Sequence, residues 1–342
     1  MIEPFSLPLS SPLSTADGAI DRREGFLVRY DHRGATGVGE ATPLPGWTES
    51  PSECRDALAR ALEAAERGHT AGLLELGGTP AARHGFSTAL LDADARADGR
   101  PLYRWLSDGR HCSRVPVNAT LGDADPAETA TAAQRAVDAD FACLKVKVGA
   151  RPVDADLDRI RRVRTAVGSD VTLRLDANGA WDRDEAREAF DALDAMDVAY
   201  VEQPLEPADL DGLADLRGGQ VGVAVDETLA TRSMADVLDA GVADVVVLKP
   251  MALGGPRTAH TLALRARDAG VEPVVTTTVD AAVARTAAVH VAAAVPDVRP
   301  CGLATADRLS SDLAPDPAPV ADGSVAVPQD PGLGFDPAEV ST

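Results

Sequence analysis

The sequence predicts an α/β protein whose larger part is a parallel sheet covered by helices. From about residue 115 onward, short β-branched runs alternate with Ala-rich amphipathic stretches, and this strand-then-helix unit recurs seven times. Before residue 115 the pattern differs, because a hairpin-like segment is followed by two helical stretches. We therefore expect a barrel-forming domain preceded by a separate α+β domain.

Each expected strand of the repeat is a short apolar run that ends at or near a polar residue. Repeated strand–helix units make the strands parallel, and an eighth strand fits closure into a barrel. The strands are expected at residues 115–121, 143–148, 171–176, 199–202, 221–226, 244–248 and 272–277, with 301–305 as the eighth. Between them, residues 154–167 and 183–195 have acids and arginines along one face, which is typical of helices packed on a sheet.

The first 114 residues are expected to form the α+β domain. Residues 26–30 and a Gly-rich turn near residues 37–39 indicate a hairpin sheet. Helices are expected to follow at residues 52–67 and 86–97. This domain would stand beside the barrel as a smaller unit.

The tail from Ala314 is rich in Pro, Asp and Gly, a composition that also suits a disordered linker. Residues 324–328 nevertheless alternate like a strand, and PGLG with Phe335 supplies apolar anchors. This favours an ordered tail that packs on the first domain. The predicted division is a domain at 1–114, a barrel at 115–306 and a returning segment at 307–342.

The charge and cysteine content exclude several classes of protein. With 33 basic and 54 acidic side chains, the net charge of −21 argues against nucleic acid as a partner. No apolar run approaches the length of a membrane span, and the first basic residue is Arg22, so a secretory signal is not expected. Four scattered cysteines favour reduced thiols, and we expect a cytoplasmic protein. The oligomeric state is not predicted.

Lysine is rare in this chain and is confined to strand-like runs. Only Lys145, Lys147 and Lys249 occur among the 33 basic residues, within CLKVKV and VVVLKP. A desolvated lysine can shift its pKa and act as a base, whereas arginine stays protonated. Lysines whose stems merely cover strand ends are the alternative interpretation.

The carboxyl ends of the expected strands bring acids and lysines to one mouth of the barrel. Lys145 points to the same strand face as Lys147, and Arg174 to the same face as Asp176, because side chains alternate along a strand. Taken in order, the strand-end residues are Lys147, Asp176, Glu202, Asp226 and Lys249.

Three carboxylates on neighbouring strands would repel one another, and this repulsion predicts a bound cation. Two unit charges about 4 Å apart repel by about 4 kcal/mol at an effective dielectric near 20. A hard divalent cation with oxygen ligands relieves this, and Mg²⁺ is the usual choice, with Mn²⁺ as a substitute. Any single acid could instead form a salt bridge. A cation flanked by lysines suits proton abstraction beside a substrate carboxylate, so we expect a small-molecule carboxylate as substrate.

Five segments, LKVKVG, LRLDANGAW, YVEQPL, VAVDETL and VVVLKP, resemble in order the motifs of the enolase superfamily, in its muconate-lactonizing branch. GVGEATPLPGWTES and VPQDPGLGF resemble the branch's capping segment and C-terminal return. The resemblance implies a (β/α)7β modified TIM barrel with an α+β capping domain. It implies Asp176, Glu202 and Asp226 as Mg²⁺ ligands. It also implies Lys147 and Lys249 as the acid/base pair and Lys145 as their KxK partner.

Within the branch, REGFLV, DANGAW and GLAT are most similar to the o-succinylbenzoate synthase family. That likeness implies dehydration of a cyclohexadiene carboxylate in menaquinone biosynthesis. N-succinylamino acid racemase and other cycloisomerases or epimerases of the branch stay open. Dipeptide epimerases are disfavoured, because residues 301–305 have no acid, and Ala304 stands where the group often has Gly or Asp. By the same likeness Trp47 and residues 14–23 belong to capping loops over the substrate.

Candidate substrate contacts are less specific than the ligands and lysines. They are Arg174, Asn178, Thr277 and Thr305. Two other classes stay open: a Schiff-base aldolase that uses a buried barrel lysine such as Lys249, and a non-catalytic binding barrel. The aldolase would not need three acids on adjacent strands, and the binding barrel would be marked by loss of a ligand, which is not seen.

Overall fold

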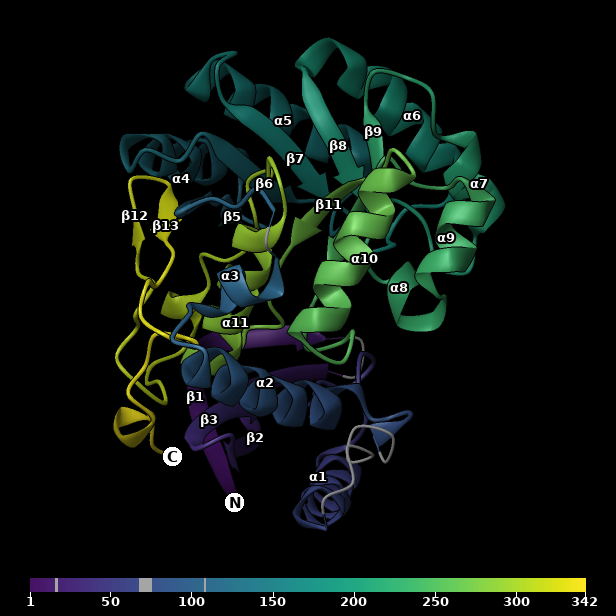
Figure 1. Ribbon diagram of the computed structural model, residues 1–342. Coiled ribbons are helices and arrows are strands. Elements are labelled where there is room, and N and C mark those ends of the chain that lie inside the picture. The colour runs from purple at the N-terminus through teal and green to yellow at the C-terminus, as the bar shows by residue number, and fades with distance from the viewer. Residues whose placement is uncertain (16–17, 68–75, 108) are drawn as a thin grey trace.

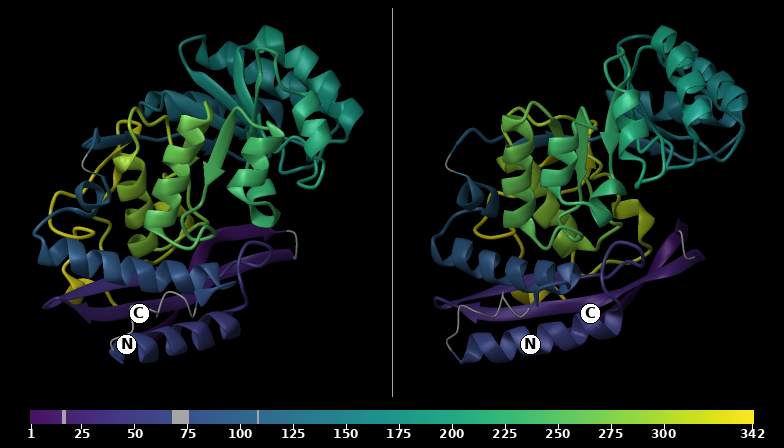
Figure 2. Two further views of the ribbon diagram at one scale, coloured as in Figure 1. Left: turned by 45° about the vertical axis from the view of Figure 1, so that its right-hand side comes forward. Right: turned by 90° about the vertical axis from the view of Figure 1, so that its right-hand side faces the viewer.

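The computed structural model describes residues 1–15, 18–67, 76–107 and 109–342 (Figure 1). The capping segment expected at residues 14–23 therefore lies partly outside the described residues. The N-terminal strands form a layer at the base of the molecule, and the parallel sheet and its helices stand above it (Figures 1 and 2).

The N-terminal layer is an antiparallel sheet of β1 (Ile2–Thr15), β2 (Gly18–His32) and β3 (Ala35–Ala41). Two helices follow it, α1 (Pro51–Glu66) and α2 (Pro80–Ala97). Helix α2 crosses one face of this sheet, so both elements bury apolar side chains there (Figure 2).

The expected Gly-rich turn near residues 37–39 is wrong. The turn lies at Arg33 and Gly34, both with positive φ, whereas Gly37 and Gly39 lie inside β3. A Cβ on Gly37 would approach the Ala89 carbonyl oxygen to 1.9 Å, and one on Gly39 would approach the Gly85 oxygen equally closely. These glycines therefore permit close packing of α2 on the sheet rather than a change of chain direction.

A seven-stranded sheet follows, in which every neighbouring pair is parallel. Its order follows the sequence: β5 (Ala119–Leu121), β6 (Cys143–Lys147), β7 (Thr172–Asp176), β8 (Val198–Glu202), β9 (Gly222–Val225), β10 (Val245–Leu248) and β11 (Glu272–Val275). Parallel bridges join Cys301 to Val117 and Gly302 to Thr276, so one short segment contacts both edges of the sheet. The expected eighth strand is thus reduced to two bridging residues.

Helices connect the strands and cover the outer face of the sheet. They are α4 (Pro126–Asp138), α5 (Val153–Val167), α6 (Arg183–Leu193), α7 (Leu210–Asp215), α8 (Thr228–Thr231), α9 (Met234–Ala240), α10 (Pro256–Asp268) and α11 (Ala282–Ala294). Capping residues set several starts: Asp182 and Glu185 form a capping box at α6, and Ser233 and Asp236 form one at α9.

The core between sheet and helices confirms the alternation expected from the strands. Leu144, Val146, Leu173 and Leu175 belong to this core. The intervening residues of β6 and β7 therefore point to the inside of the curved sheet. Every residue of α11 is buried, which suits its Ala-rich sequence, and its one charged residue, Arg285, forms ion pairs with Asp312 and Asp316.

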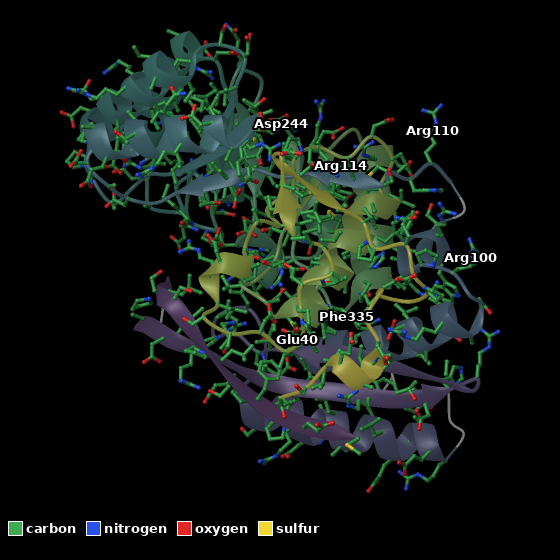
Figure 3. The ribbon with its side chains drawn as sticks, turned by 90° about the vertical axis from the view of Figure 1, so that its left-hand side faces the viewer. Glu40, Arg100, Arg110, Arg114, Asp244 and Phe335 are labelled. Carbon is green, nitrogen blue, oxygen red and sulfur yellow. The ribbon has the colours of Figure 1, made fainter. Side chains whose placement is uncertain are left out.

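The C-terminal segment lies against both earlier parts of the chain. Strand β13 (Ser324–Ala326) pairs antiparallel with β12 (Val320–Ala321) and with β4 (Arg114–Pro116). Farther along, Arg29 of β2 donates to the carbonyl oxygens of Pro337 and Val340. Figure 3 shows Phe335 on this segment above the N-terminal strands. Short helical turns complete the chain at α3 (Leu102–Leu106), Asp194–Met196, Ala306–Arg308 and Pro337–Glu339.

Candidate active site

The register of the sheet aligns the candidate residues in two layers. Lys147 pairs with Asp176, which pairs with Glu202, and these form the layer at the carboxyl ends of their strands. Lys145 pairs with Arg174 in the layer beneath. Because parallel strands run in the same direction, these ends meet at one mouth, as the sequence predicts.

Lysine ammonium groups hold the three strand-end carboxylates. Lys145 Nζ lies 3.0 Å from Asp176 Oδ2 and 2.9 Å from Glu202 Oε1, so it bridges the two acids. Lys147 Nζ lies 2.7 Å from the same Asp176 oxygen. Lys249 Nζ lies 2.6 Å from Asp226 Oδ2. The structure thus brings all six residues into one chain of ion pairs and neighbouring strand ends.

Burial distinguishes the lysines from one another and from their acid partners. The side chains of Asp176, Glu202 and Asp226 are at most 4% exposed. Lys147 is 36% exposed, against 16% for Lys145. Lys147 is therefore the lysine most open to an incoming molecule.

The burial and the crowding of charge shift the pKa values of these groups. Burial, together with repulsion from Asp176, raises the pKa of Glu202 to about 7. Burial opposes ionisation of Asp176 too, but Lys145 and Lys147 outweigh it and hold the pKa of Asp176 below its ordinary value. Burial would lower the pKa of Lys145, yet Asp176 and Glu202 raise it well above the ordinary lysine value. Lys145 is thus a fixed positive charge.

The metal expectation can be tested against the donor atoms. In the described residues no group of three or more His, Cys, Asp or Glu side chains forms a ready-made metal cluster, because the carboxylates are turned to lysines. Asp226 Oδ1 and Glu227 Oε2 are buried and have no hydrogen-bond partner within the described protein. Burial raises the pKa of Asp226 to about 6 even beside Lys249, and Glu227 adds repulsion. Buried carboxylate oxygens without a partner are the donors that Mg²⁺ prefers, so these residues fit the ion.

Two residues that sequence reasoning missed support this cluster. Buried Gln203 accepts from the backbone N–H groups of Asp226 and Thr228, which fixes the start of the loop after β9. Glu227 accepts from Asn178 Nδ2 at 2.9 Å. The EQPL and DETL segments contained both residues, and a polar residue directly after each strand-end acid was the available signal.

The four candidate substrate contacts occupy different positions. Asn178 lies beside the cluster, where its Oδ1 accepts from Lys147 Nζ at 2.6 Å. Thr277 and Thr305 form a separate hydroxyl pair at 3.0 Å on the side of β11. Arg174 lies in the lower layer, stacked on the Tyr200 ring and donating to the Pro300 carbonyl oxygen. Among the described contacts, Arg174 makes none with the strand-end acids.

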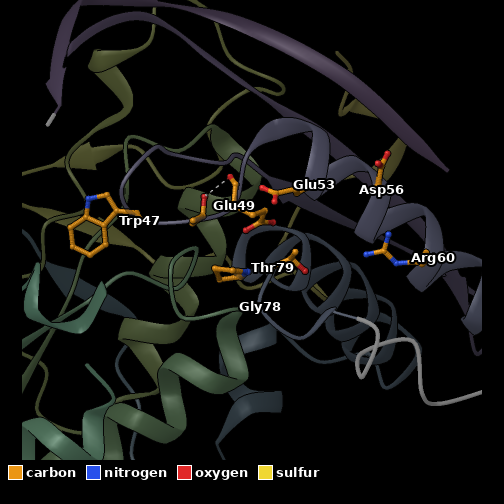
Figure 4. A pocket seen from close by; sticks show the side chains of 9 residues that line it. Trp47, Glu49, Glu53, Asp56, Arg60, Gly78 and Thr79 are labelled. Atoms are coloured by element: carbon orange, nitrogen blue, oxygen red, sulfur yellow. Dashed lines mark hydrogen bonds between the residues drawn. The ribbon is translucent and has the colours of Figure 1, made fainter. Parts of the chain in front are cut away.

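A tryptophan from the N-terminal part covers one of the lysines. The ring centroid of Trp47 lies 3.4 Å from Lys249 Nζ. Trp47 also borders a cavity of about 540 Å³, whose other lining residues come from α1, the loop before it and the start of α2 (Figure 4). None of the strand-end acids or lysines lines this cavity, so the chemistry is assigned to the strand ends and not to this cavity.

Comparisons with known proteins give the family. The family described as "Enolase C-terminal domain-like" matches residues 128–341, and "MenC, N-terminal domain" matches residues 2–93. The o-succinylbenzoate synthase of Thermobifida fusca is 35% identical over 90% of this chain and 82% of its own length. The L-Ala-D/L-Glu epimerase of Bacillus subtilis is 30% identical over 97% of this chain and 94% of its own.

Solved structures agree with the sequence matches. The substrate-liganded L-Ala-D/L-Glu epimerase from Bacillus subtilis superposes with a TM-score of 0.88 at 30% identity, over 98% of this chain and 97% of that one. The dipeptide epimerase from Enterococcus faecalis, complexed with Mg and L-Leu-L-Tyr, gives 0.85 at 26% identity, with 98% of each chain covered. Muconate lactonizing enzyme from Pseudomonas fluorescens gives 0.85 at 26% identity, over 98% and 95%.

This chain is a member of the enolase superfamily. It belongs to the muconate-lactonizing branch, and its N-terminal part is of the MenC type. The family resemblance expected from the motifs is therefore confirmed. Among the helices that the structure describes, none combines the length and the apolarity needed to cross a bilayer.

Proposed function

We propose that this protein is an o-succinylbenzoate synthase. It would dehydrate 2-succinyl-6-hydroxy-2,4-cyclohexadiene-1-carboxylate to 2-succinylbenzoate for menaquinone biosynthesis. The observation that carries the proposed proton abstraction is the pair of lysines, Lys147 and Lys249, on either side of three buried strand-end carboxylates. The MenC-type N-terminal match supports this choice within the branch.

The proposed roles follow from contacts and exposure. Asp176, Glu202 and Asp226 would hold Mg²⁺, which when bound supplies positive charge to the substrate carboxylate. Lys147, the most exposed lysine, removes the α-proton, and its position is set by Asn178 and Asp176. Lys249 stabilises the negative charge that develops on the substrate. Hydroxide then leaves and takes a proton from Lys147, so that water is released and the ring becomes aromatic.

The remaining structural expectations belong to the same proposal. We take residues 115–306 as a (β/α)7β barrel, closed by the bridges of Cys301 and Gly302. Residues 1–114 would be its capping domain, and residues 307–342 the segment that returns to it. Thr277 and Thr305 would contact the part of the substrate away from the metal, and Arg174 would support the site from below.

A racemase or epimerase is the second candidate. The N-succinyl-L-Arg/Lys racemase of Bacillus cereus is 29% identical over 84% of this chain, close to the values for the synthases. Such an enzyme would use the same lysines to exchange an α-proton on an amino acid derivative. A Schiff-base aldolase is less well supported, because Lys249 is ion-paired with Asp226 rather than isolated among apolar side chains.

One assay distinguishes these activities. Purified protein with Mg²⁺ or Mn²⁺ is given the cyclohexadiene substrate and, in separate reactions in D₂O, N-succinyl amino acids and L-Ala-D/L-Glu. Loss of the diene absorbance with efficient turnover supports the synthase. Fast deuterium exchange into an amino acid without diene turnover would assign the protein to the racemases or epimerases.

A further inference from the structure

A buried arginine from the N-terminal sheet bonds to two loops that border the candidate active site. Arg23 of β2 is 2% exposed. Its guanidinium donates to three backbone carbonyl oxygens: Thr42 at 3.0 Å, Pro43 at 3.1 Å and Val279 at 3.2 Å. Thr42 and Pro43 begin the loop that carries Trp47, and Val279 lies in the loop that follows β11. A single planar group thus joins two segments that are distant in the sequence.

The first loop connects Arg23 to Lys249. Directly after Pro43, the Leu44 carbonyl oxygen accepts from the Trp47 backbone N–H at 3.1 Å, and Leu44 N–H donates to Thr48 Oγ1 at 2.9 Å. These bonds form a closed turn, so the position of Trp47 depends on where the turn starts. The Trp47 ring in turn lies 3.4 Å from Lys249 Nζ.

The second loop connects Arg23 to the threonine pair. Val279 follows Thr277 by two residues and has φ of +60°, a conformation that is strained for a β-branched residue. Such a backbone conformation persists only where its surroundings impose it, and the bond from Arg23 Nε to the Val279 oxygen is one such constraint. Thr277 Oγ1 lies 3.0 Å from Thr305 Oγ1.

Acidic groups lie in the seam where the N-terminal sheet meets α11 and the loop before it. Glu40, seen in Figure 3 where the N-terminal sheet meets the rest of the molecule, accepts from the backbone N–H groups of Ala281 and Ala284 at 2.9 Å each. It thereby caps α11 from another part of the chain. Asp280 accepts from the hydroxyl group of Thr278. Glu40 and Asp280 are negative neighbours of Arg23, so its charge is compensated within the seam.

We propose that Arg23 is a positioning residue for substrate binding, which sets the distance between the Trp47 loop and the Thr277 loop across the mouth of the site. The inference rests on the proposed function in one respect, that substrate binds at these strand ends. Arg23 does not touch the reacting atoms. Its loss is expected to weaken substrate binding more than it slows the chemical step.

Arg164 provides a matched control. Its guanidinium donates to the carbonyl oxygens of Met196, Gly168, Val171 and Asp197, so it also joins two loops through backbone oxygens. These loops precede β7 and β8 and therefore lie at the opposite end of the sheet, where residues serve stability. Arg164→Met should lower the melting temperature and leave KM unchanged.

The kinetic experiment compares Arg23→Met with Arg164→Met. For Arg23→Met we expect kcat/KM for the cyclohexadiene substrate to fall about 10- to 100-fold, mostly through KM, since small displacements of binding groups have effects of this size. Arg23→Lys should recover only part of the loss, because an ammonium group cannot span three carbonyl oxygens. Equal losses in the Arg23 and Arg164 variants would overturn the proposal. If Arg23→Met does not fold, Arg23→Lys is judged by the same KM criterion.

A second readout needs no substrate. In a Trp105→Phe/Trp181→Phe background, Trp47 is the remaining tryptophan. Arg23→Met should increase acrylamide quenching of its fluorescence, and Arg164→Met should not. An unchanged quenching constant in the Arg23 variant would overturn the proposal. If the protein turns over none of the substrates offered, the proposed function fails, and quenching still decides whether Arg23 positions Trp47.

Discussion

The strand-end cluster and the seam between the N-terminal sheet and α11 both bury carboxylates, but they satisfy them differently. In the seam, both oxygens of Glu40 accept hydrogen bonds, from Thr42 and from the backbone of α11. In the cluster, Asp226 Oδ1 and Glu227 Oε2 accept none from the described protein. Its acids instead depend on lysine ammonium groups.

The difference indicates which buried charges serve folding and which serve chemistry. A buried carboxylate oxygen without a partner costs about 1–3 kcal/mol, and at these strand ends a bound cation would offset that cost. In the seam, Glu40 is held by backbone N–H groups, which do not act as acids or bases near pH 7. In the cluster, the lysine ammonium groups can transfer protons, and the carboxylate oxygens without a partner can bind a cation. Variants that change how the acids of the two regions are satisfied should therefore affect different measurements.

The largest effect is expected from replacing either acid/base lysine. Lys147→Arg keeps the positive charge but removes the ability to exchange a proton near pH 7, so turnover should fall by about 10²–10⁴-fold. Lys249→Arg replaces a compact ammonium group beside Asp226 and Trp47 with a larger guanidinium group, so the positive charge is displaced from where negative charge develops on the substrate, and turnover should fall as well. Steady-state kinetics on the diene substrate measures this. The melting temperature serves as the control and should change little. An arginine variant that keeps more than about a tenth of wild-type activity would remove that lysine from its proposed role.

The next effect concerns the metal. Asp226→Asn keeps the shape of the side chain and removes its charge, so we expect weaker Mg²⁺ binding together with lower turnover. Calorimetric titration with Mg²⁺ measures the first, and activity at increasing Mg²⁺ measures the second. Full activity of the wild-type protein after exhaustive treatment with EDTA would reject a metal-dependent mechanism.

Much of this arrangement was predictable, because strand alternation and strand-end position are local properties of the sequence. The β6 pattern of Lys145 and Lys147 on one face with Val146 on the other is what the structure contains. The family was predictable for a similar reason, since each motif lies within one strand and its following loop. Helix α2 begins earlier than expected because Pro80 can occupy its first turn.

What the sequence could not predict depends on contacts between distant segments. Gly37 and Gly39 look like a turn, but only the position of α2 explains them as packing residues. Arg174 lies on the same face as Asp176, yet one layer lower, where Tyr200 and Pro300 surround it. The partners of Arg23 lie up to 256 residues away. No local pattern reports such contacts.

A smaller effect is expected in the seam, on stability against pH. Burial, with repulsion from Asp280, raises the pKa of Glu40 to about 7 from an ordinary value of 4.5. The folded state therefore binds more protons than the unfolded state between these values, and stability falls as pH rises through this window. Glu40→Gln should remove about 3 kcal/mol of that fall, at 1.36 kcal/mol per pKa unit. Urea unfolding at pH 4.5 and pH 7 measures the free energy of unfolding of the wild-type and Glu40→Gln proteins. An equal fall between the two pH values in both proteins would contradict the prediction.

The smallest effects come from a pair of threonines, one in each region. Thr42 donates to Glu40 at 2.6 Å in the seam, and Thr277 pairs with Thr305 beside the site. Thr42→Val should lower the free energy of unfolding by about 1 kcal/mol, the usual contribution of one hydrogen bond, with KM unchanged. Thr277→Val should lower the free energy of unfolding by a similar amount and in addition raise KM a few-fold, because the proposed function places its hydroxyl group against the substrate. Both variants are measured by urea unfolding and by steady-state kinetics. If Thr42→Val raised KM as much as Thr277→Val, the separation between acids that serve folding and acids that serve chemistry would be wrong at this point, and Glu40 would have to be counted with Arg23 among the residues that position the substrate.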